Sequence, residues 1–205
     1  MSSITCWPGS PASSRFTDVG ARPLPWPMVE SGAPKTSRVE LRDGSSVLVA
    51  ELYPDDRDRF LGGMQQASPE SVYRRFMTPM PRLSDAQVRY LLEVDHRDHE
   101  ALLAVDEAGG EAVAVGRFIR LSDDPEVAEV AMLVIDSWQG LGLGTALGRL
   151  LASRAVELGI KRFEGRMLVD NAAILAVLES LGEPRVVARE GGELVMHVEL
   201  GAPPG

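Results

Sequence analysis

The sequence is short of cysteine and has no long apolar run. Cys6 is the only cysteine among 205 residues, which excludes an intramolecular disulfide and a cysteine-based metal site. No apolar stretch approaches the roughly 18 residues that a membrane-spanning helix needs. The first residues lack the basic region and apolar core of a secretory signal peptide. These absences predict a cytoplasmic protein with no membrane partner.

Basic residues are also scarce relative to acidic ones. The chain has 21 Lys and Arg residues against 30 Asp and Glu residues, and a formal net charge of −9. Such a balance argues against a broad nucleic-acid-binding surface. An acidic surface would suit a cationic substrate, such as a lysine side chain or a polyamine, although acidity also simply favours solubility.

The first 37 residues differ in composition from the rest of the chain. They are rich in Pro, Ser and Gly, and they show no hydrophobic period. Residues 1–37 are therefore predicted to be a disordered tail. The alternative is a partner-binding segment anchored by Trp7 and Trp26. Residues 38–205 are expected to form one domain.

The remaining sequence alternates between strand-like and helix-like segments. Turn signals and apolar periods predict strands at residues 39–41, 47–52, 101–105, 112–121, 127–135, 160–169, 185–189 and 194–200. Helices are predicted at residues 56–66, 69–76, 85–94, 145–158 and 171–181, and serines at positions 68 and 84 provide N-caps for two of them. This order indicates an α/β domain with a mixed sheet.

The most informative stretch is residues 129–144, EVAMLVIDSWQGLGLG, in which a buried-type strand leads into a glycine-rich turn and a helix. Backbone N–H groups at such a helix start can bind a phosphate. A nucleotide P-loop would need Gly-Lys-Ser/Thr, but Gly144 is followed by Thr145 and Ala146. The dinucleotide fingerprint fails too, because its third glycine would fall on Thr145 or Leu147.

The turn instead fits the pattern Q-x-x-G-x-G, with Gln139, Gly142 and Gly144 in place. This resembles the acetyl-coenzyme A loop of the GNAT N-acetyltransferase superfamily; the alternative is a glycine-rich loop with no ligand. The segments at residues 68–76 and 98–104, with Ala128-Glu129-Val130-Ala131, resemble bacterial Pat-type protein lysine acetyltransferases.

The resemblance implies a GNAT fold and an acetyl-CoA cosubstrate. The expected fold is a mixed, mostly antiparallel sheet of six or seven strands, splayed at its central strands and flanked by about four helices. The coenzyme-binding residues that it implies are Met132, Leu133, Val134, Gln139, Gly140, Leu141, Gly142, Leu143, Gly144, Thr145 and Asn171. Backbone groups of the strand residues would contact the pantetheine arm, and the glycine loop would surround the pyrophosphate.

Glu129 is the candidate general base, as the resemblance implies for this place in the motif. It shares a strand face with Ala131 and Leu133, and desolvation there would raise its pKa towards neutrality. The alternative is a structural carboxylate paired with Arg117 or Arg120 on the preceding strand.

The general acid is left open by the sequence. Relatives often carry a tyrosine seven residues after the asparagine, but here that position is Leu178. The aromatic residue often found after the helix-ending glycine is replaced by Glu183. Solvent could protonate the leaving thiolate instead.

Two further groups of residues each allow a functional and a structural interpretation. His96 and His99 lie in a polar stretch, which favours a solvated loop beside the sheet over a metal site, so no metal is expected. The segment Tyr73-Arg74-Arg75-Phe76 could line the acceptor cleft or form an ordinary packed helix.

Together these observations predict an acetyl-CoA-dependent N-acetyltransferase that acts on lysine side chains of proteins by direct attack in a ternary complex. Acyl-CoA synthetases are the acceptors that the resemblance suggests. A small-molecule amine acetyltransferase and a non-catalytic acetyl-CoA sensor are the alternatives, and the protein is expected to be a monomer or homodimer.

Overall fold

The structure is a computed structural model that describes residues 36–77 and 82–201 of the chain. Residues 1–35 of the expected tail lie outside this part, so that prediction stays untested. The first strand begins at Ser37, one residue before the expected start of the domain. Within the described residues, no helix is long and apolar enough to cross a membrane.

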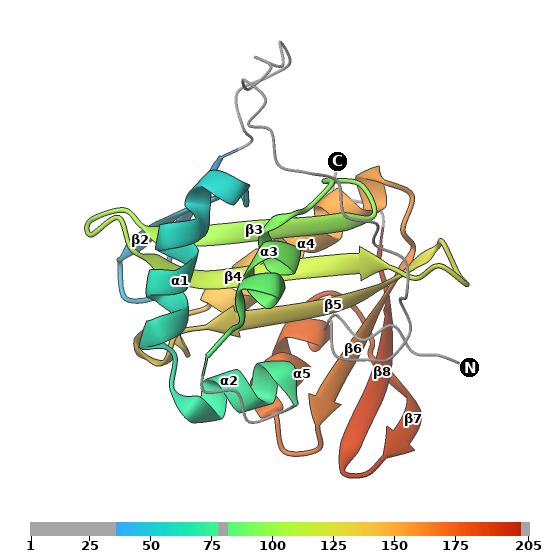
Figure 1. The fold of residues 1–205 in the computed structure, drawn as a ribbon. Coiled ribbons are helices and arrows are strands. Elements are labelled where there is room, and N and C mark those ends of the chain that lie inside the picture. Colours follow the sequence, from blue (N-terminus) through green and yellow to red (C-terminus); the bar gives the residue numbers. More distant parts are fainter. Residues whose placement is uncertain (1–35, 78–81, 202–205) are drawn as a thin grey trace, which may run out of the picture.

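The described strands form one eight-stranded sheet (Figure 1). They are β1 (Ser37–Glu40), β2 (Ser46–Glu51), β3 (His99–Asp106), β4 (Ala112–Arg120), β5 (Val127–Val134), β6 (Arg162–Leu168), β7 (Arg185–Glu190) and β8 (Glu193–Glu199). Their order is β1-β2-β3-β4-β5-β6-β8-β7, and every neighbouring pair is antiparallel except β5 and β6. The expected mixed, mostly antiparallel sheet is confirmed. It has eight strands rather than six or seven, because the hairpins at both ends join it in full.

The described residues form five α-helices, as the five helical segments of the sequence predicted and one more than the family resemblance implied. They are α1 (Arg57–Gln66), α2 (Pro69–Phe76), α3 (Asp85–Leu92), α4 (Leu143–Glu157) and α5 (Ala172–Glu179). Short 3-10 turns precede α1 and α4, at Pro54–Asp56 and Asp136–Trp138. The first turn explains why α1 begins at Arg57 rather than at Asp56.

The predicted N-caps of α2 and α3 are present. The Ser68 hydroxyl oxygen accepts a hydrogen bond from the Ser71 N–H at 3.2 Å. Ser84 and Gln87 form the full capping box, with distances of 3.3 Å and 2.7 Å. These bonds satisfy N–H groups that have no partner within the helix.

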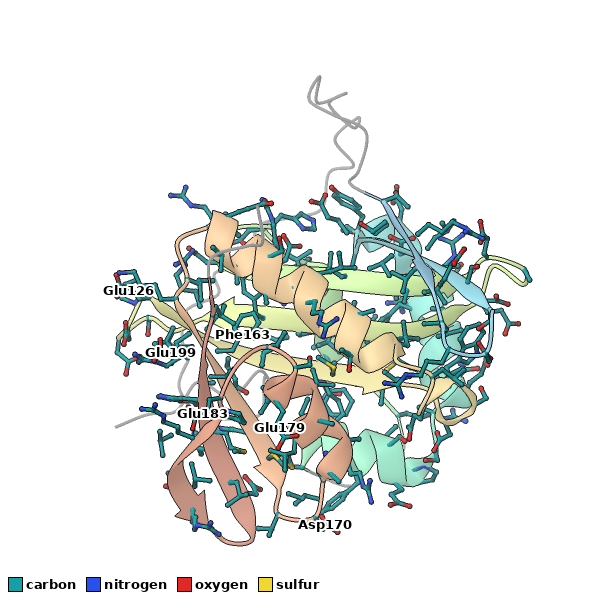
Figure 2. The ribbon with its side chains drawn as sticks, turned by 180° about the vertical axis from the view of Figure 1, so that it is seen from behind. Glu126, Phe163, Asp170, Glu179, Glu183 and Glu199 are labelled. Carbon is teal, nitrogen blue, oxygen red and sulfur yellow. The ribbon has the colours of Figure 1, made fainter. Side chains whose placement is uncertain are left out.

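The helices cover the two faces of the sheet. Figure 1 shows α1, α2 and α3 over one face, and Figure 2 shows α4 and α5 over the other. On the α4 face, Leu147 and Leu151 pack into a buried cluster with Phe118 and Phe163. Gly116 lets α4 approach closely, because a Cβ atom there would lie 2.8 Å from a Leu151 methyl carbon.

A second cluster fills the opposite face. Phe60 of α1 and Leu91 of α3 pack there with Leu103 and Leu133 of the sheet. All four side chains are at most 5% exposed. The two clusters hold the central strands rigidly from both sides, which fixes the place where β5 and β6 separate.

That separation is the expected splay, and it is confirmed. β5 pairs with β4 as far as Val134, opposite Ala114. Its pairing with β6 stops earlier, where Val130 lies opposite Gly165. The last four residues of β5 therefore have a partner strand on one side only.

Candidate active site

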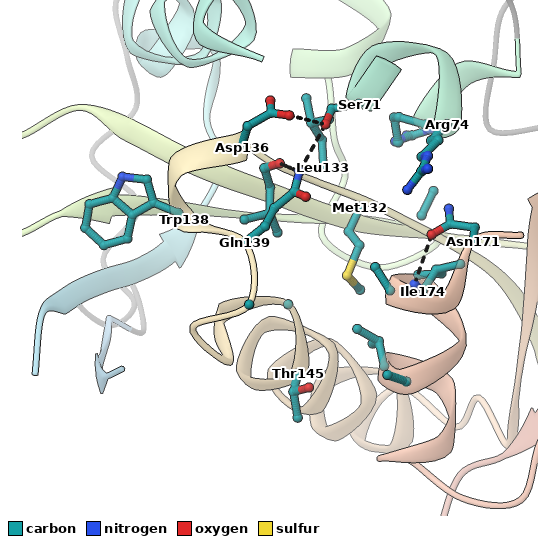
Figure 3. A pocket seen from close by; sticks show the side chains of 18 of the residues that line it. Ser71, Arg74, Met132, Leu133, Asp136, Trp138, Gln139, Thr145, Asn171 and Ile174 are labelled. Carbon is teal, nitrogen blue, oxygen red and sulfur yellow. Dashed lines mark hydrogen bonds between the residues drawn. The ribbon is translucent and has the colours of Figure 1, made fainter. Parts of the chain in front are cut away.

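A pocket of about 410 Å³ lies where β5 and β6 separate (Figure 3). Residues of α2, β5, β6, α5 and the loop between β5 and α4 line it. Of the residues expected from the sequence, those that line this pocket are Met132, Leu133, Val134, Gln139, Gly140, Gly142, Gly144, Thr145 and Asn171. The fold thus brings α2 and α5, which are about 100 residues apart in the sequence, to the same pocket.

The unpaired edge of β5 directs backbone groups towards the β6 side. The N–H of Ile135 donates to the Val113 carbonyl oxygen on β4, at 3.0 Å. Because backbone groups alternate along a strand, Leu133 also faces β4, whereas Met132 and Val134 face the gap. The Val134 carbonyl oxygen confirms this direction, since it accepts a hydrogen bond from Gln139 across the gap. A ligand could therefore pair with Met132 and with the Val134 N–H, but with Leu133 only through its side chain.

The glycine loop presents the N-terminus of α4 to the same pocket. Gly140 and Gly142 have φ angles of 75° and 92°, a backbone conformation that residues other than glycine rarely adopt. The helix begins at Leu143, and no acidic residue lies in its first turn. The N–H groups of this turn have no partner within the helix, and the helix dipole places partial positive charge there. The loop fits an anionic group such as a pyrophosphate.

Of the other loop residues, Gly144 lines the pocket, whereas Leu141 and Leu143 do not. A Cβ atom on Gly144 would lie 3.4 Å from Val177 and 3.9 Å from the Met132 sulfur, so glycine keeps the space between α4 and β5 open. The side chains of Leu141 and Leu143 do not line the pocket. Leu143 is fully buried in the core. Any contact of these two leucines with a coenzyme must come from their backbone.

Hydrogen bonds tie the loop to α2. The Gln139 amide nitrogen donates to the Ser71 hydroxyl at 3.0 Å and to the Val134 carbonyl oxygen at 2.9 Å. The Asp136 carboxylate accepts the Ser68 N–H and hydroxyl, each at 2.8 Å, and the Ser71 hydroxyl at 3.2 Å (Figure 3). The Ser68 and Ser71 bonds lower the pKa of Asp136, so it carries a charge at neutral pH.

Asn171 is the N-cap of α5 and also lines the pocket. Its side-chain oxygen accepts the Ile174 N–H at 3.3 Å, as expected for a cap. The residue is 8% exposed, and no described residue forms a hydrogen bond with its amide nitrogen. The amide nitrogen of Asn171 carries two N–H donors, and the cap uses neither of them.

Glu129 is buried just before the pocket wall. It is 5% exposed, and the next residue, Val130, is the first of β5 to line the pocket. It shares a sheet face with Leu133, on the side that α1, α2 and α3 cover. Glu129 itself is not among the residues that line the pocket, so it lies behind the wall that Val130 begins.

Two arginines were alternatives as partners of Glu129. Arg120 is engaged elsewhere, with Asp98 at 2.8 Å and the Leu158 carbonyl oxygen at 2.9 Å. Arg117 is 2% exposed and lies opposite Ala131, one diagonal position from Glu129 on the same face. Only the Arg117 alternative is therefore compatible with the sheet register.

The two histidines do not form the solvated loop that the sequence indicated. His99 begins β3, and its Nε2 atom lies 3.1 Å from an Arg117 nitrogen. Burial and the Arg117 charge lower the pKa of His99 to about 4. His96 has a positive φ angle of 55° and bonds the fully buried Glu100 at 2.7 Å. Asp95, Arg97 and Asp98 of this polar stretch are exposed, whereas His96 and His99 are half-buried and bond charged side chains.

The His96 cluster is a set of possible metal ligands outside the pocket. One side-chain ligand atom each from Glu51, His96 and Glu100 lie within 4.8 Å of one another. Both Glu100 oxygens already have protein partners, His96 Nδ1 at 2.7 Å and Arg154 Nε at 3.0 Å. Burial tends to raise the pKa of Glu100, but these two bonds outweigh it and lower the pKa. Burial tends to lower the pKa of His96, and the Glu100 bond and charge outweigh it and raise the pKa.

The α2 segment lines the pocket with some residues and packs against the core with others, so both interpretations of residues 73–76 hold in part. Arg74 and Arg75 line the pocket, whereas Phe76 is 8% exposed and packs beneath the helix. Tyr73 is 40% exposed and does not line the pocket. The helical period places the arginines on the pocket side.

Two arginines that the sequence did not indicate also line the pocket. Arg42 lies in the turn between β1 and β2, and Arg166 lies on β6. Neither belongs to a local motif. Only the tertiary fold brings them beside the glycine loop and the splay, so no sequence signal was available to find them.

Leu178 cannot act as a proton donor at this site. It is fully buried, and a Cβ atom on Gly165 would lie 3.0 Å from its Cδ1 atom. It therefore packs against β6 rather than lining the pocket. Among the described residues that line the pocket there is no tyrosine, histidine, cysteine or lysine.

The chain was compared with known proteins. Residues 47–183 match the family described as acetyltransferase (GNAT) domain. The chain is 36% identical over 166 residues to "Acetyltransferase Pat" of Mycolicibacterium smegmatis. The aligned region covers 81% of this chain and 49% of that protein. It thus spans about half the length of that relative.

Solved structures give the same result. The GNAT domain of S. lividans PAT matches with a TM-score of 0.75 and 32% identity, covering 82% of this chain and 100% of that one. A cAMP-binding acyltransferase from Mycobacterium smegmatis matches with a TM-score of 0.58 and 30% identity, covering 83% of this chain and 48% of that one. Fold, glycine loop and comparisons agree: the chain belongs to the GNAT family of acetyltransferases.

Proposed function

We propose that this protein transfers acetyl groups from acetyl-CoA to lysine side chains of proteins. The observation that carries the proposal is the unpaired edge of β5, which runs directly into a glycine loop at a helix N-terminus. An extended pantetheine arm can add to such an edge as a strand would. The loop then receives the pyrophosphate at the far end of that arm.

Different residues bind the pantetheine arm and hold the glycine loop in shape. The Met132 backbone and the Val134 N–H bind the arm, and the Asn171 amide nitrogen donates to it from the opposite side of the pocket. Gln139, whose side chain is engaged with Ser71 and Val134, holds the loop in shape rather than reaching for the ligand.

The transfer itself needs a base and an oxyanion donor. The lysine nitrogen attacks the thioester carbonyl carbon, the carbon–sulfur bond breaks, and the amine proton passes to Glu129. The Met132 N–H, which faces the gap, is the donor available to the developing oxyanion. Solvent protonates the departing thiolate, because the described residues that line the pocket include no tyrosine, histidine, cysteine or lysine.

Lysine as the acceptor is what the resemblance to Pat-type protein lysine acetyltransferases implies, and one relative is named "Acetyltransferase Pat". The experiment mixes the full chain with acetyl-CoA and either a lysine-bearing acyl-CoA synthetase or a panel of small amines. Release of free thiol measures turnover, and mass spectrometry locates the acetyl group. Acetylated lysine on the synthetase supports the proposal.

The other outcomes favour different functions. Turnover with small amines alone would indicate a small-molecule acetyltransferase. Tight acetyl-CoA binding without thiol release from any acceptor would indicate a sensor.

A further inference from the structure

The pocket wall is cationic although the chain as a whole is acidic. The charged residues that line it are Arg42, Arg74, Arg75, Arg166, Glu70 and Asp136. Four arginines thus face two carboxylates, whereas the whole chain has 21 basic and 30 acidic residues. Asp136 is already bonded by Ser68 and Ser71, so it offers little negative charge to a ligand.

These arginines occupy two separate ends of the pocket. Arg42 lies at the glycine loop, with its Nε atom 3.6 Å from the position of a Cβ atom on Gly142. Arg74 lies at the opposite end, and in Figure 3 Met132 stands between it and Thr145. The coenzyme phosphates have Arg42 and the free N–H groups of α4 at their own end. The other arginines that line the pocket, Arg74, Arg75 and Arg166, add positive charge to the rest of its wall.

Arg166 stands at the start of the splay. It follows Gly165, the last residue of β6 that pairs with β5. It is on the same sheet face as Glu164, which lies opposite Glu129. Arg166 therefore lies on the side of the sheet that holds the proposed base, next to the path of an incoming amine.

Both Arg74 and Arg166 are partly withdrawn from solvent. The Arg74 side chain is 37% exposed and bonds Glu70 at 2.7 Å, but the Glu70 side chain is 71% exposed and can turn away. The Arg166 side chain is 18% exposed, and its Nε atom lies 3.7 Å from a carboxylate oxygen of Glu164. Positive charge in a concave, partly dry wall acts more strongly on an anion than the same charge on an open surface.

We propose that the acceptor lysine lies among acidic residues, which Arg74, Arg75 and Arg166 bind while the amine reaches Glu129. This inference rests on the proposed function. It reverses the expectation from net charge, because a cationic acceptor segment would be repelled at this entrance.

The test uses three peptides with one lysine each, flanked by glutamates, by glutamines or by arginines. The full chain should acetylate the glutamate peptide with a kcat/KM at least tenfold above that of the glutamine peptide. The arginine peptide should be the poorest. Raising the salt concentration should narrow these differences, because the attraction is electrostatic.

Charge reversal gives the matched test. Arg74→Glu should remove or invert the preference between the glutamate and arginine peptides. Arg89→Glu, on the exposed face of α3, should leave it as in the wild type. Calorimetry with acetyl-CoA should give the same Kd for Arg74→Glu and the wild type, since the coenzyme phosphates lie at the other end.

Three results would overturn the inference. Equal kcat/KM for the three peptides would remove it while leaving the proposed function intact. A weakened acetyl-CoA affinity in Arg74→Glu would assign that arginine to the coenzyme instead. Absence of turnover with every peptide and with the synthetase would remove the proposed function as well.

Discussion

The backbone N–H of Arg42 donates a hydrogen bond to the carbonyl oxygen of Leu141, 3.1 Å away. This bond fastens the β1–β2 turn to the glycine loop, although the two segments are about 100 residues apart. It also places an exposed guanidinium beside the N-terminus of α4. In the described residues no carboxylate forms an ion pair with that guanidinium. The turn thus adds a full positive charge to the partial charge of the helix.

The first prediction concerns this arginine. Arg42→Ala should weaken acetyl-CoA binding about five- to tenfold, since a charge-assisted contact to phosphate contributes about 1 kcal/mol or more at an exposed position. Calorimetry measures the effect, and higher salt should reduce the difference between variant and wild type. Arg149→Ala on the exposed side of α4 is the control and should bind normally. An unchanged affinity in Arg42→Ala would show that the guanidinium does not reach the phosphates.

The second prediction concerns the glycine at the start of α4. Gly142→Asp should abolish measurable acetyl-CoA binding, because it places a negative charge where the phosphate must lie and strains a residue with a φ angle of 92°. Gly159→Asp is the matched control, since Gly159 has a similar φ angle of 82° but lies after the end of α4. Both variants should lose similar stability, and only Gly142→Asp should lose the ligand. Equal affinities would argue against the loop as the phosphate site.

The fold could be predicted largely from local signals. The N-caps at Ser68 and Ser84 and the glycine pattern around Gly142 act over a few residues, and all three are present in the structure. The splay at Val130 was expected from family resemblance rather than from periodicity. All eight predicted strand segments are present, but the expected sheet had six or seven strands, because the joining of edge hairpins to one sheet is a long-range property.

The site was predictable where it follows one segment of chain. Gly140, Gly142 and Thr145 line the pocket because loop and helix are continuous with β5. Arg42 and Arg166 come from distant strands, so no local pattern could indicate them. The sequence also did not show which way the side chains of the motif point. Leu143 belongs to the motif, yet its side chain is fully buried in the core.

The third prediction separates the two roles considered for Glu129. If it is the general base, Glu129→Gln should lower kcat by about 10²–10⁴-fold and leave the acetyl-CoA Kd unchanged. If it mainly neutralises the buried Arg117, the same variant should lose stability by roughly 3 kcal/mol and keep much of its activity. Thiol release and urea unfolding, measured on one preparation, distinguish the roles. Glu93→Gln, an exposed position just after α3, should change neither quantity.

The fourth prediction concerns pH and His99. Burial and the Arg117 charge lower the pKa of folded His99 to about 4, from an ordinary value of 6.5, and outweigh the opposing charges of Asp95 and Glu100. Between these values the unfolded chain binds a proton that the folded chain does not. Stability should therefore fall as the pH falls from 6.5 to 5, by roughly 1–2 kcal/mol.

The effect of His96 can be separated from that of His99. The pKa of His96 is raised, so its stabilising contribution is complete below pH 6.5 and does not vary in the window. His99→Gln keeps a side chain that can accept a hydrogen bond from Arg117 but removes the titration. Urea unfolding at pH 6.5 and 5.0 should show a smaller loss in His99→Gln than in the wild type. Equal losses would mean that carboxylates, rather than His99, set the acid sensitivity of the fold.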